Sequence, residues 1–165
     1  MSMRLDVRIQ GEDFDVGREQ ALIEDAAADV GGVVSFTGRV RRSVFDAGVA
    51  GESVSEVQAL EIEHYPGMTE RSVEAVAEEA GRRWPLSALT VIHRVGRLEP
   101  GSQIVLVLAA SRHRQAAFDA ARFVMDYLKT RAVFWKREVY RDGARWVESR
   151  ADDHAAAKSW RASDR

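Results

Sequence analysis

Apolar residues recur along the chain with two different periods. Over residues 3–9, polar and apolar side chains alternate, as they do in a β-strand with one buried face. Alternation or short apolar runs predict further strands over 31–40, 56–64, 89–96 and 103–110. Helical spacing predicts helices over 19–29, 69–84 and 112–130. Hairpins mixed with helices in this order favour the α+β class over a doubly wound parallel sheet.

The two longer predicted helices have recognisable ends and buried faces. Thr69 is expected to be the N-cap of the first and Ser111 the N-cap of the second. Their apolar stripes comprise Val73, Val76, Ala77 and Ala80 in the first and Ala117, Ala121, Val124 and Leu128 in the second. Residues 132–140 and 145–149 then predict a closing hairpin, because the Asp-Gly pair between them is a strong turn signal.

Length and composition predict one globular domain spanning residues 1–165. The chain has 45% apolar and 30% charged residues, which is typical of a soluble protein with its own core. Residues 46–55 are rich in Gly, Ala and Ser and lack periodicity, so we expect a mobile surface loop there. Residues 151–165 are expected to form a C-terminal tail.

The absence of cysteine excludes several kinds of chemistry. Without a thiol, the chain can form no disulfide, no Cys-ligated metal site and no cysteine nucleophile of its own. The N-terminus lacks the basic and apolar regions of a secretory signal. The apolar run over 104–110 is too short to span a bilayer. We therefore expect a cytoplasmic protein that does not enter a membrane.

Charge is distributed unevenly, although the net charge is only −2. Residues 11–30 contain seven acidic residues and one Arg, whereas residues 112–145 contain nine Lys or Arg and four Asp or Glu. This asymmetry suggests an anionic ligand near the later segment. A solvated basic face, balanced elsewhere in the fold, explains the charges equally well.

The start of the predicted helix over 112–130 is a candidate anion site. With Ser111 as the cap, His113 and Arg114 fall in the first turn, where free backbone N–H groups and the helix dipole favour an anion. The alternative is that these cations only point into water. A bound anion would offset their unfavourable position, so the functional interpretation is favoured.

Two lysines near the end of the same helix are the next candidates. Arg122, Met125 and Lys129 share a helix face, and Met125 could form an apolar wall that lowers a lysine pKa. A lysine that simply complements the helix dipole is the alternative. Strand alternation places Lys136 on the same face as Phe134 and Glu138, which is either a site wall or the solvent side of a sheet.

The separation of these candidates predicts a dimer. Sixteen residues separate His113 from Lys129, which is about 24 Å along a straight helix. Groups so far apart cannot act on one small molecule within a single chain. If both act on the same substrate, the site must combine two subunits of a symmetric dimer.

Other motifs are weak or missing. His64 and His93 are isolated histidines on or beside strands, which are more often packed or surface groups than ligands. The sequence contains no HExxH, Walker or GxGxxG motif and no carboxylate cluster with metal spacing, so no metal and no cofactor are expected.

Several blocks of sequence together resemble the large, catalytic subunit family of molybdopterin synthase. They are FTGRVR (36–41), LEIEHYPGMTE (60–70), RWPLSALTVIHRVGRLEPG (83–101), SRHRQAAF (111–118), MDYLKTRAVFWKRE (125–138) and RWVESR (145–150). The resemblance extends from about Val33 to Trp160. It implies an α+β fold of the α/β hammerhead type, with a mixed, largely antiparallel sheet and three main helices.

The resemblance also implies a reaction and its participants. The family transfers two sulfurs to cyclic pyranopterin monophosphate, which forms the dithiolene of molybdopterin. The sulfur donor is the C-terminal Gly-Gly thiocarboxylate of a small ubiquitin-like subunit, and the large subunits form a homodimer with shared sites. The lack of cysteine in this chain is consistent with a sulfur supplied by a partner.

The resemblance implies roles for individual residues at matching positions. Lys129 and Lys136 would be the central catalytic lysines, transferring protons and stabilising the intermediate. The substrate-binding residues would be Arg41, His113 and Arg114 for the phosphate and pterin, Phe36 and Met125 for the pocket wall, and Arg150 from the neighbouring subunit.

Two departures from the family pattern and two alternative functions accompany this interpretation. The loop over 43–55 is longer than usual, and Val133 replaces a frequent proline.

The FWKREVYR segment interleaves aromatic and basic residues, as a single-stranded RNA-binding module would, although the overall acidity opposes binding to nucleic acid. A scaffold that binds the small subunit without catalysis is disfavoured by the intact lysines.

Overall fold

The computed structural model describes residues 3–26, 29–45 and 54–162. Its first sheet has the strand order β1-β6-β8-β2. The strands are β1 (Arg4–Gln10), β6 (Leu86–Arg94), β8 (Gln103–Ser111) and β2 (Gly32–Arg39). β1 pairs with β6 in parallel, and the other pairs are antiparallel. β6 and β8 are central strands covered on both faces, which explains their nearly continuous apolar runs.

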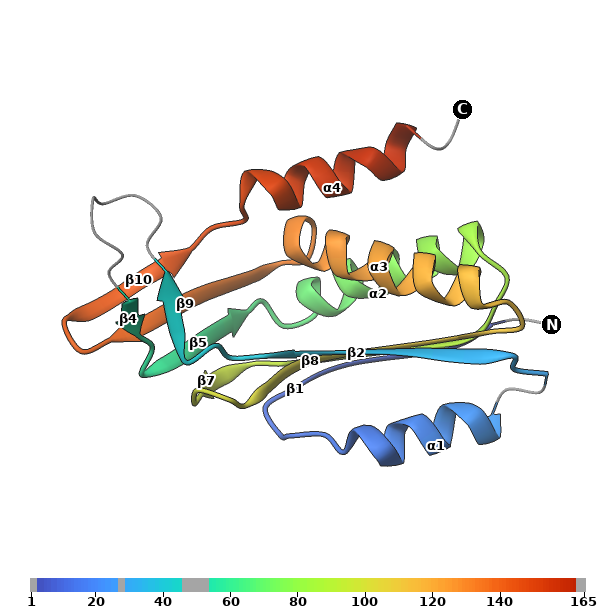
Figure 1. Cartoon of the computed structure of the whole chain (residues 1–165), viewed down its shortest axis with the longest axis horizontal. Helices are drawn as coiled ribbons and strands as arrows, with labels where there is room; N and C mark the ends of the chain where they lie inside the picture. Colours follow the sequence, from blue (N-terminus) through green and yellow to red (C-terminus); the bar gives the residue numbers. More distant parts are fainter. Residues whose placement is uncertain (1–2, 27–28, 46–53, 163–165) are drawn as a thin grey trace.

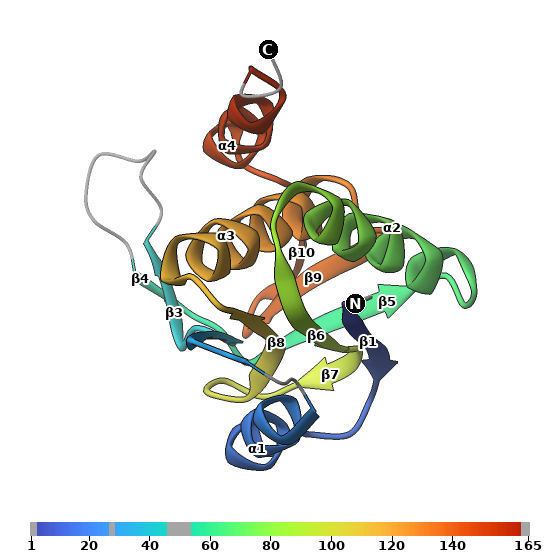
Figure 2. The same cartoon turned by 90° about the vertical axis from the view of Figure 1, so that its right-hand side faces the viewer.

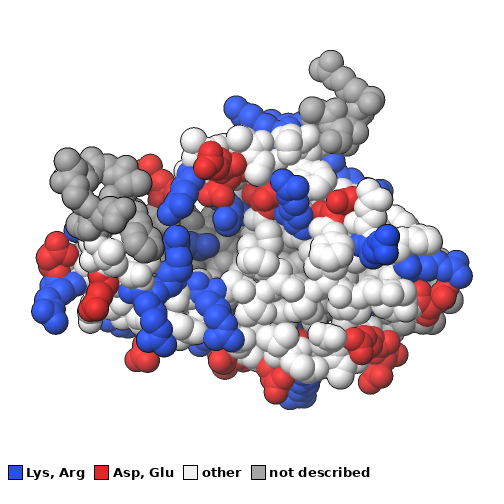
Figure 3. Space-filling model, viewed as in Figure 1, with Lys and Arg blue, Asp and Glu red and all other residues white. Residues whose placement is uncertain are grey.

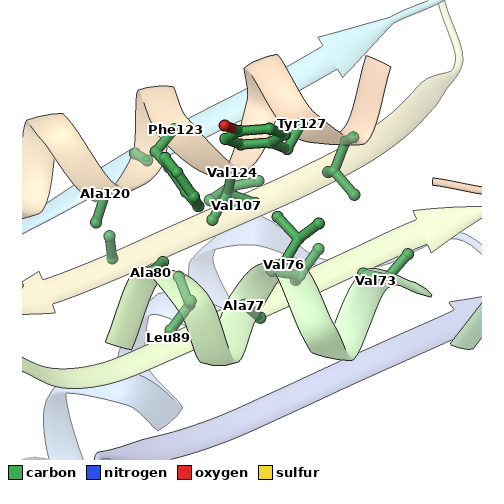
Figure 4. Close-up of a cluster of buried hydrophobic side chains, with 14 of the residues drawn as sticks. Val73, Val76, Ala77, Ala80, Leu89, Val107, Ala120, Phe123, Val124 and Tyr127 are labelled. Carbon is green, nitrogen blue, oxygen red and sulfur yellow. The ribbon is translucent and has the colours of Figure 1, made fainter. Parts of the chain in front are cut away.

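Helices cover both faces of this sheet (Figures 1 and 2). α2 (Met68–Arg83) and α3 (Arg114–Thr130) lie side by side on one face, and α1 (Val16–Ala26) lies on the other. Both predicted apolar stripes are confirmed, since every residue in them is buried. Figure 4 shows Val76 and Val73 of α2 facing Val124 and Tyr127 of α3 across the main core.

A second sheet extends from one end of the first and carries half of the site. Its order is β10-β9-β5-β7, with β10 (Gly143–Val147), β9 (Phe134–Tyr140), β5 (Ala59–His64) and β7 (Gly96–Leu98), and all its pairs are antiparallel. The predicted closing hairpin is confirmed as β9–β10. A short ladder of β3 (Ser43–Phe45) and β4 (Val54–Glu56) lies beside it.

The C-terminal segment forms a fourth helix, where a tail was expected. α4 (Ala151–Ala162) packs on α3 through an aromatic cluster in which Trp160 contacts Trp84 and Phe123, with ring centroids 5.5 and 5.7 Å apart. The hydroxyl of Tyr127 donates a hydrogen bond to the Ala157 carbonyl at 3.1 Å. The expectation of three main helices was therefore wrong by one, because the contacts that hold α4 come from residues far away in sequence.

Both predicted N-caps were wrong, because each hydroxyl bonds to a distant carbonyl. Gly67 is the N-cap of α2, and Thr69 lies within the first turn, where its Oγ1 donates to the Val133 carbonyl at 2.7 Å. His113 is the N-cap of α3. Ser111 is the buried last residue of β8, and its Oγ donates to the Pro85 carbonyl at 2.9 Å.

Other boundaries shift by a few residues. β6 begins at Leu86, before the predicted start at 89, and α1 begins at Val16, before the predicted start at 19. Of the loop expected over 46–55, residues 46–53 lie outside the described residues, and the last two positions belong to β4. No helix within the described ranges is long and apolar enough to cross a membrane. The single domain over residues 1–165 stays a prediction.

Candidate active site

A cavity of about 630 Å³ lies where the end of α3, the start of β9 and the segment before α4 meet the end of β2. Figure 3 shows Lys and Arg side chains gathered around a hollow in this part of the surface. Its charged lining residues are Arg39, Arg41, Lys129, Lys136, Arg150, Glu138, Glu148, Asp152 and Asp153. The cavity therefore offers both cationic donors and carboxylate acceptors.

Lys129 is held at the rim of the cavity by an ion pair. It lies in the last turn of α3, where its charge complements the helix dipole. Its Nζ is 3.0 Å from Oδ1 of Asp153 on α4, and the two side chains are 51% and 21% exposed. The segment before α4 also contacts this helix end, because the Ser149 hydroxyl donates a hydrogen bond to the Lys129 carbonyl.

Lys136 lies deeper and has a different environment. It shares the inner face of β9 with Phe134 and Glu138, as strand alternation predicted, and all three line the cavity. Burial lowers the pKa of Lys136, the nearby charge of Lys129 lowers it further, and Asp153 opposes both effects. Within the described part of the chain, Lys136 has no carboxylate within ion-pair distance. Such a lysine loses its proton more readily than an exposed one.

His93 is a cavity residue that the sequence interpretation missed. It lies on β6, is only 2% exposed, and stacks on Phe134 with ring centroids 3.9 Å apart. Burial, together with the charge of Lys136, lowers its pKa to about 3. The neutral ring can donate from Nδ1 to the Arg94 carbonyl, 2.8 Å away, which leaves Nε2 as an acceptor. A histidine within the apolar run of β6 was the available signal.

The remaining predicted pocket residues divide into two groups. Phe36, Arg41, Met125 and Arg150 all line the same cavity as the lysines. Phe36 projects from β2 and remains 43% exposed, and Met125 lies one helical turn before Lys129. Arg150 lines the cavity of its own chain, whereas the resemblance implied that it reaches in from a neighbouring subunit.

His113 and Arg114 do not join this cavity within one chain. Both are exposed at the N-terminal end of α3, and neither lines the cavity. α3 is continuous over 114–130, so the predicted separation of about 24 Å between His113 and Lys129 holds for this chain. A role for the pair in the same reaction requires a second subunit.

The carboxylates and histidines do not form a metal site in the part of the chain that is described. No group of three or more His, Asp or Glu residues there is arranged to hold a metal ion. Asp153 is instead committed to Lys129 and to the Arg150 N–H, and Glu138 accepts a hydrogen bond from the Tyr140 hydroxyl.

Comparison with known proteins places the chain in a family. Residues 9–131 match the family model described as MoaE protein. The molybdopterin synthase catalytic subunit of Mesorhizobium japonicum is 53% identical over 159 residues, which cover 95% of this chain and 94% of that protein. The corresponding subunit of Escherichia coli is 51% identical, with 89% of this chain and 92% of that protein covered.

Solved structures agree with the sequence match. The molybdopterin biosynthesis MoaE protein from Burkholderia ambifaria superimposes with a TM-score of 0.75 at 45% identity, covering 97% of this chain and 98% of that one. Molybdopterin synthase from Staphylococcus aureus gives a TM-score of 0.71 at 26% identity, covering 85% and 95%. The expected α+β fold of mixed, largely antiparallel sheets is confirmed. The chain belongs to the MoaE family.

Proposed function

We propose that the chain is the catalytic subunit of a molybdopterin synthase. It transfers two sulfurs to cyclic pyranopterin monophosphate and so forms the dithiolene of molybdopterin, in molybdenum cofactor biosynthesis. The observation that carries the proposal is the meeting of Lys129 and Lys136 at one cavity, in a chain whose relatives are named as this enzyme. No cofactor is required for sulfur transfer of this kind, and we expect none.

The two lysines have complementary properties for this reaction. Lys136 lies in an environment that favours the neutral amine, which suits a group that takes up and releases protons. Lys129 is an exposed cation at the rim, where it can stabilise negative charge that develops on the substrate or the incoming thiocarboxylate. Phe36 and Met125 provide apolar walls, and Arg41 and Arg150 provide donors for an anionic group.

The sulfur must come from another molecule. The chain has no cysteine, so none of its own side chains can carry sulfur as a thiol or persulfide. We propose a small ubiquitin-like subunit whose Gly-Gly thiocarboxylate enters the cavity. A cytoplasmic location fits this partner and stays a prediction.

We also propose that two copies of the chain form a dimer with shared sites. His113 and Arg114 lie at the opposite end of α3 from the lysines, so a second copy is needed to bring them to a substrate phosphate. Mixing Lys129→Ala subunits with His113→Ala subunits tests this arrangement. If the sites are shared, each mixed dimer has one site with both substitutions and one site with neither, so one of its two sites is restored. A site contained in one chain would restore none.

A single-turnover assay tests the proposed reaction. The purified chain is mixed with thiocarboxylated small subunit and the pterin precursor, and the pterin is analysed by mass spectrometry. We expect the dithiolene from wild type and none from Lys129→Ala. Lys158 is the third lysine of the chain, is exposed on α4 and lies outside the cavity, so Lys158→Ala is the matched control. A wild type that leaves the precursor without sulfur would contradict the proposal.

A further inference from the structure

α4 places a carboxylate against the lysine pair. Asp153 lies in the first turn of α4, and its two carboxylate oxygens have different partners. Oδ2 accepts the Arg150 N–H at 3.1 Å, which caps the start of the helix. Oδ1 is 3.0 Å from Lys129 Nζ. Capping therefore uses only one oxygen, and the other is directed at the cavity.

The position of Asp153 is fixed by the rest of α4. Trp160 packs against both Trp84 and Phe123, and its Nε1 donates to Asp126 of α3 at 2.8 Å. Arg83 of α2 donates to the Trp160 carbonyl at 3.0 Å. With the helix anchored two turns further on, the Asp153 side chain needs little ordering to meet Lys129.

Asp153 is also electrically coupled to Lys136. The charged or titratable side chains that line the cavity with Lys136 are Lys129 from α3, His93 from β6, Glu138 from β9, Arg39 and Arg41 from β2 and the residues after it, and Glu148, Arg150, Asp152 and Asp153 from the segment around the start of α4. Of these, Lys129 lowers the pKa of Lys136 and Asp153 raises it. Although burial disfavours the charged form of Asp153, hydrogen bonds from Lys129 and Arg150 outweigh it and lower its pKa, so Asp153 is an anion at neutral pH.

We propose that Asp153 is a positioning residue for sulfur transfer: its Oδ1, 3.0 Å from Lys129 Nζ, fixes that ammonium at the cavity rim, and its carboxylate places a negative charge in the lining of the same cavity as Lys136. The proposal rests on the proposed function for the reaction itself. It assigns the two lysines unequal roles, with Lys129 as the fixed cation and Lys136 as the group that exchanges a proton.

The decisive variant is Asp153→Asn, because asparagine retains an oxygen that can cap α4 but carries no charge. We expect kcat to fall by about 2- to 5-fold, since Lys129 loses a half-exposed ion pair. The acidic limb of the pH profile of kcat/KM should move to lower pH, because Lys136 loses a neighbouring anion. Asp153→Glu should restore the wild-type limb. Glu78→Gln is the control, since it removes an exposed ion pair with Arg82 on α2, away from the cavity.

A second measurement needs no turnover. The chain has only three lysines, so NMR titration of isotope-labelled lysine side chains can follow Lys136 directly, with Lys136→Arg for assignment. The titration midpoint of Lys136 should fall in Asp153→Asn and return in Asp153→Glu. An unchanged midpoint together with an unchanged pH profile would overturn the proposal and reduce Asp153 to a helix cap. If the wild-type protein transfers no sulfur in the single-turnover assay, the proposed function is refuted. The NMR titration would still decide whether Asp153 shifts the titration midpoint of Lys136.

Discussion

The imidazole of His93 lies flat on the ring of Phe134, with the centroids 3.9 Å apart and the planes inclined by 20°. One ring comes from a central strand of the first sheet and the other from the first residue of β9 in the second sheet. The stack therefore joins the two sheets at the cavity that the lysine pair also lines. Any change of protonation at His93 acts on this junction.

We expect His93 to make the protein acid-sensitive. Its folded pKa of about 3 lies below the ordinary value of 6.5, so the unfolded chain takes up a proton between these values and the folded chain does not. The contribution of neutral His93 to the free energy of unfolding is therefore fully present above pH 6.5 and is lost as pH falls towards 3. Urea denaturation should show that His93 accounts for a loss of about 2 kcal/mol between pH 7 and pH 5.

Urea denaturation of His93→Phe over the same pH range should lack the loss of stability assigned to His93, because phenylalanine preserves the stack and has no proton to bind. Replacing the exposed His154 by Asn provides the control and should leave the wild-type pH dependence intact. Equal acid sensitivity of His93→Phe and wild type would refute the prediction.

Lys136→Met should increase stability while abolishing sulfur transfer. Methionine retains the unbranched side chain and removes a charge whose burial is unfavourable, so we expect a gain of about 1 kcal/mol at pH 7. The folded pKa of Lys136 lies below its ordinary value of 10.5, and stability rises with pH between the two. Scanning calorimetry should therefore show the melting temperatures of variant and wild type converging as pH approaches 10. A variant less stable than wild type at pH 7 would contradict this account.

Trp160→Ala should detach α4 and weaken the site without unfolding the sheets. Trp160 contacts two aromatic rings and donates to Asp126, so its truncation should cost about 3 kcal/mol in the free energy of unfolding. Sulfur transfer should fall with it, because Asp153 is no longer held against Lys129. Trp135→Ala is the stability control, since Trp135 is 47% exposed on the outer face of β9. If Trp160→Ala loses no more unfolding free energy than Trp135→Ala, contacts other than those of Trp160 hold α4 in place.

Gly31→Ala should destabilise the chain, whereas Gly32→Ala should not. A Cβ at Gly31 would lie 2.1 Å from the backbone oxygen of Arg112, just before the start of α3. Because the clash is with backbone, relief requires a shift of the strand or the helix start, at about 2 kcal/mol. A Cβ at Gly32 meets nothing within 4 Å. Denaturation midpoints of the two variants measure the difference, and equal midpoints would contradict the close approach.

Much of the architecture was predictable because it depends on local periodicity. The apolar stripe that includes Val124 and Leu128 and the turn before Gly143 identify α3 and the β9–β10 hairpin from neighbouring residues alone. The inner face of β9 was also predictable, since alternation places Phe134 and Lys136 together. Their catalytic interpretation, however, came from resemblance and not from spacing.

What escaped prediction depends on residues distant in sequence. Thr69 bonds to a carbonyl 64 positions away, so its sequence context could only suggest a cap. α4 has an Ala-rich sequence with no local reason to dock, and its anchor Trp160 finds its aromatic partners at the end of α2 and on α3. His93 becomes a cavity residue only when β6 and β9 meet at their ends.

The parallel pairing of β1 with β6 has a consequence for the order of folding. Its partners run from Arg4 with Ala88 to Gln10 with Arg94, so every pair is separated by 84 positions along the chain. The antiparallel β6–β8 pair is much closer in sequence and requires a far smaller loop to close. The β6–β8 pair is thus available as a nucleus, and β1 can add to it only after a long loop has closed. Refolding should therefore be limited by the docking of the first strand, which makes the N-terminal end of the chain the slowest part of the sheet to acquire its native neighbours.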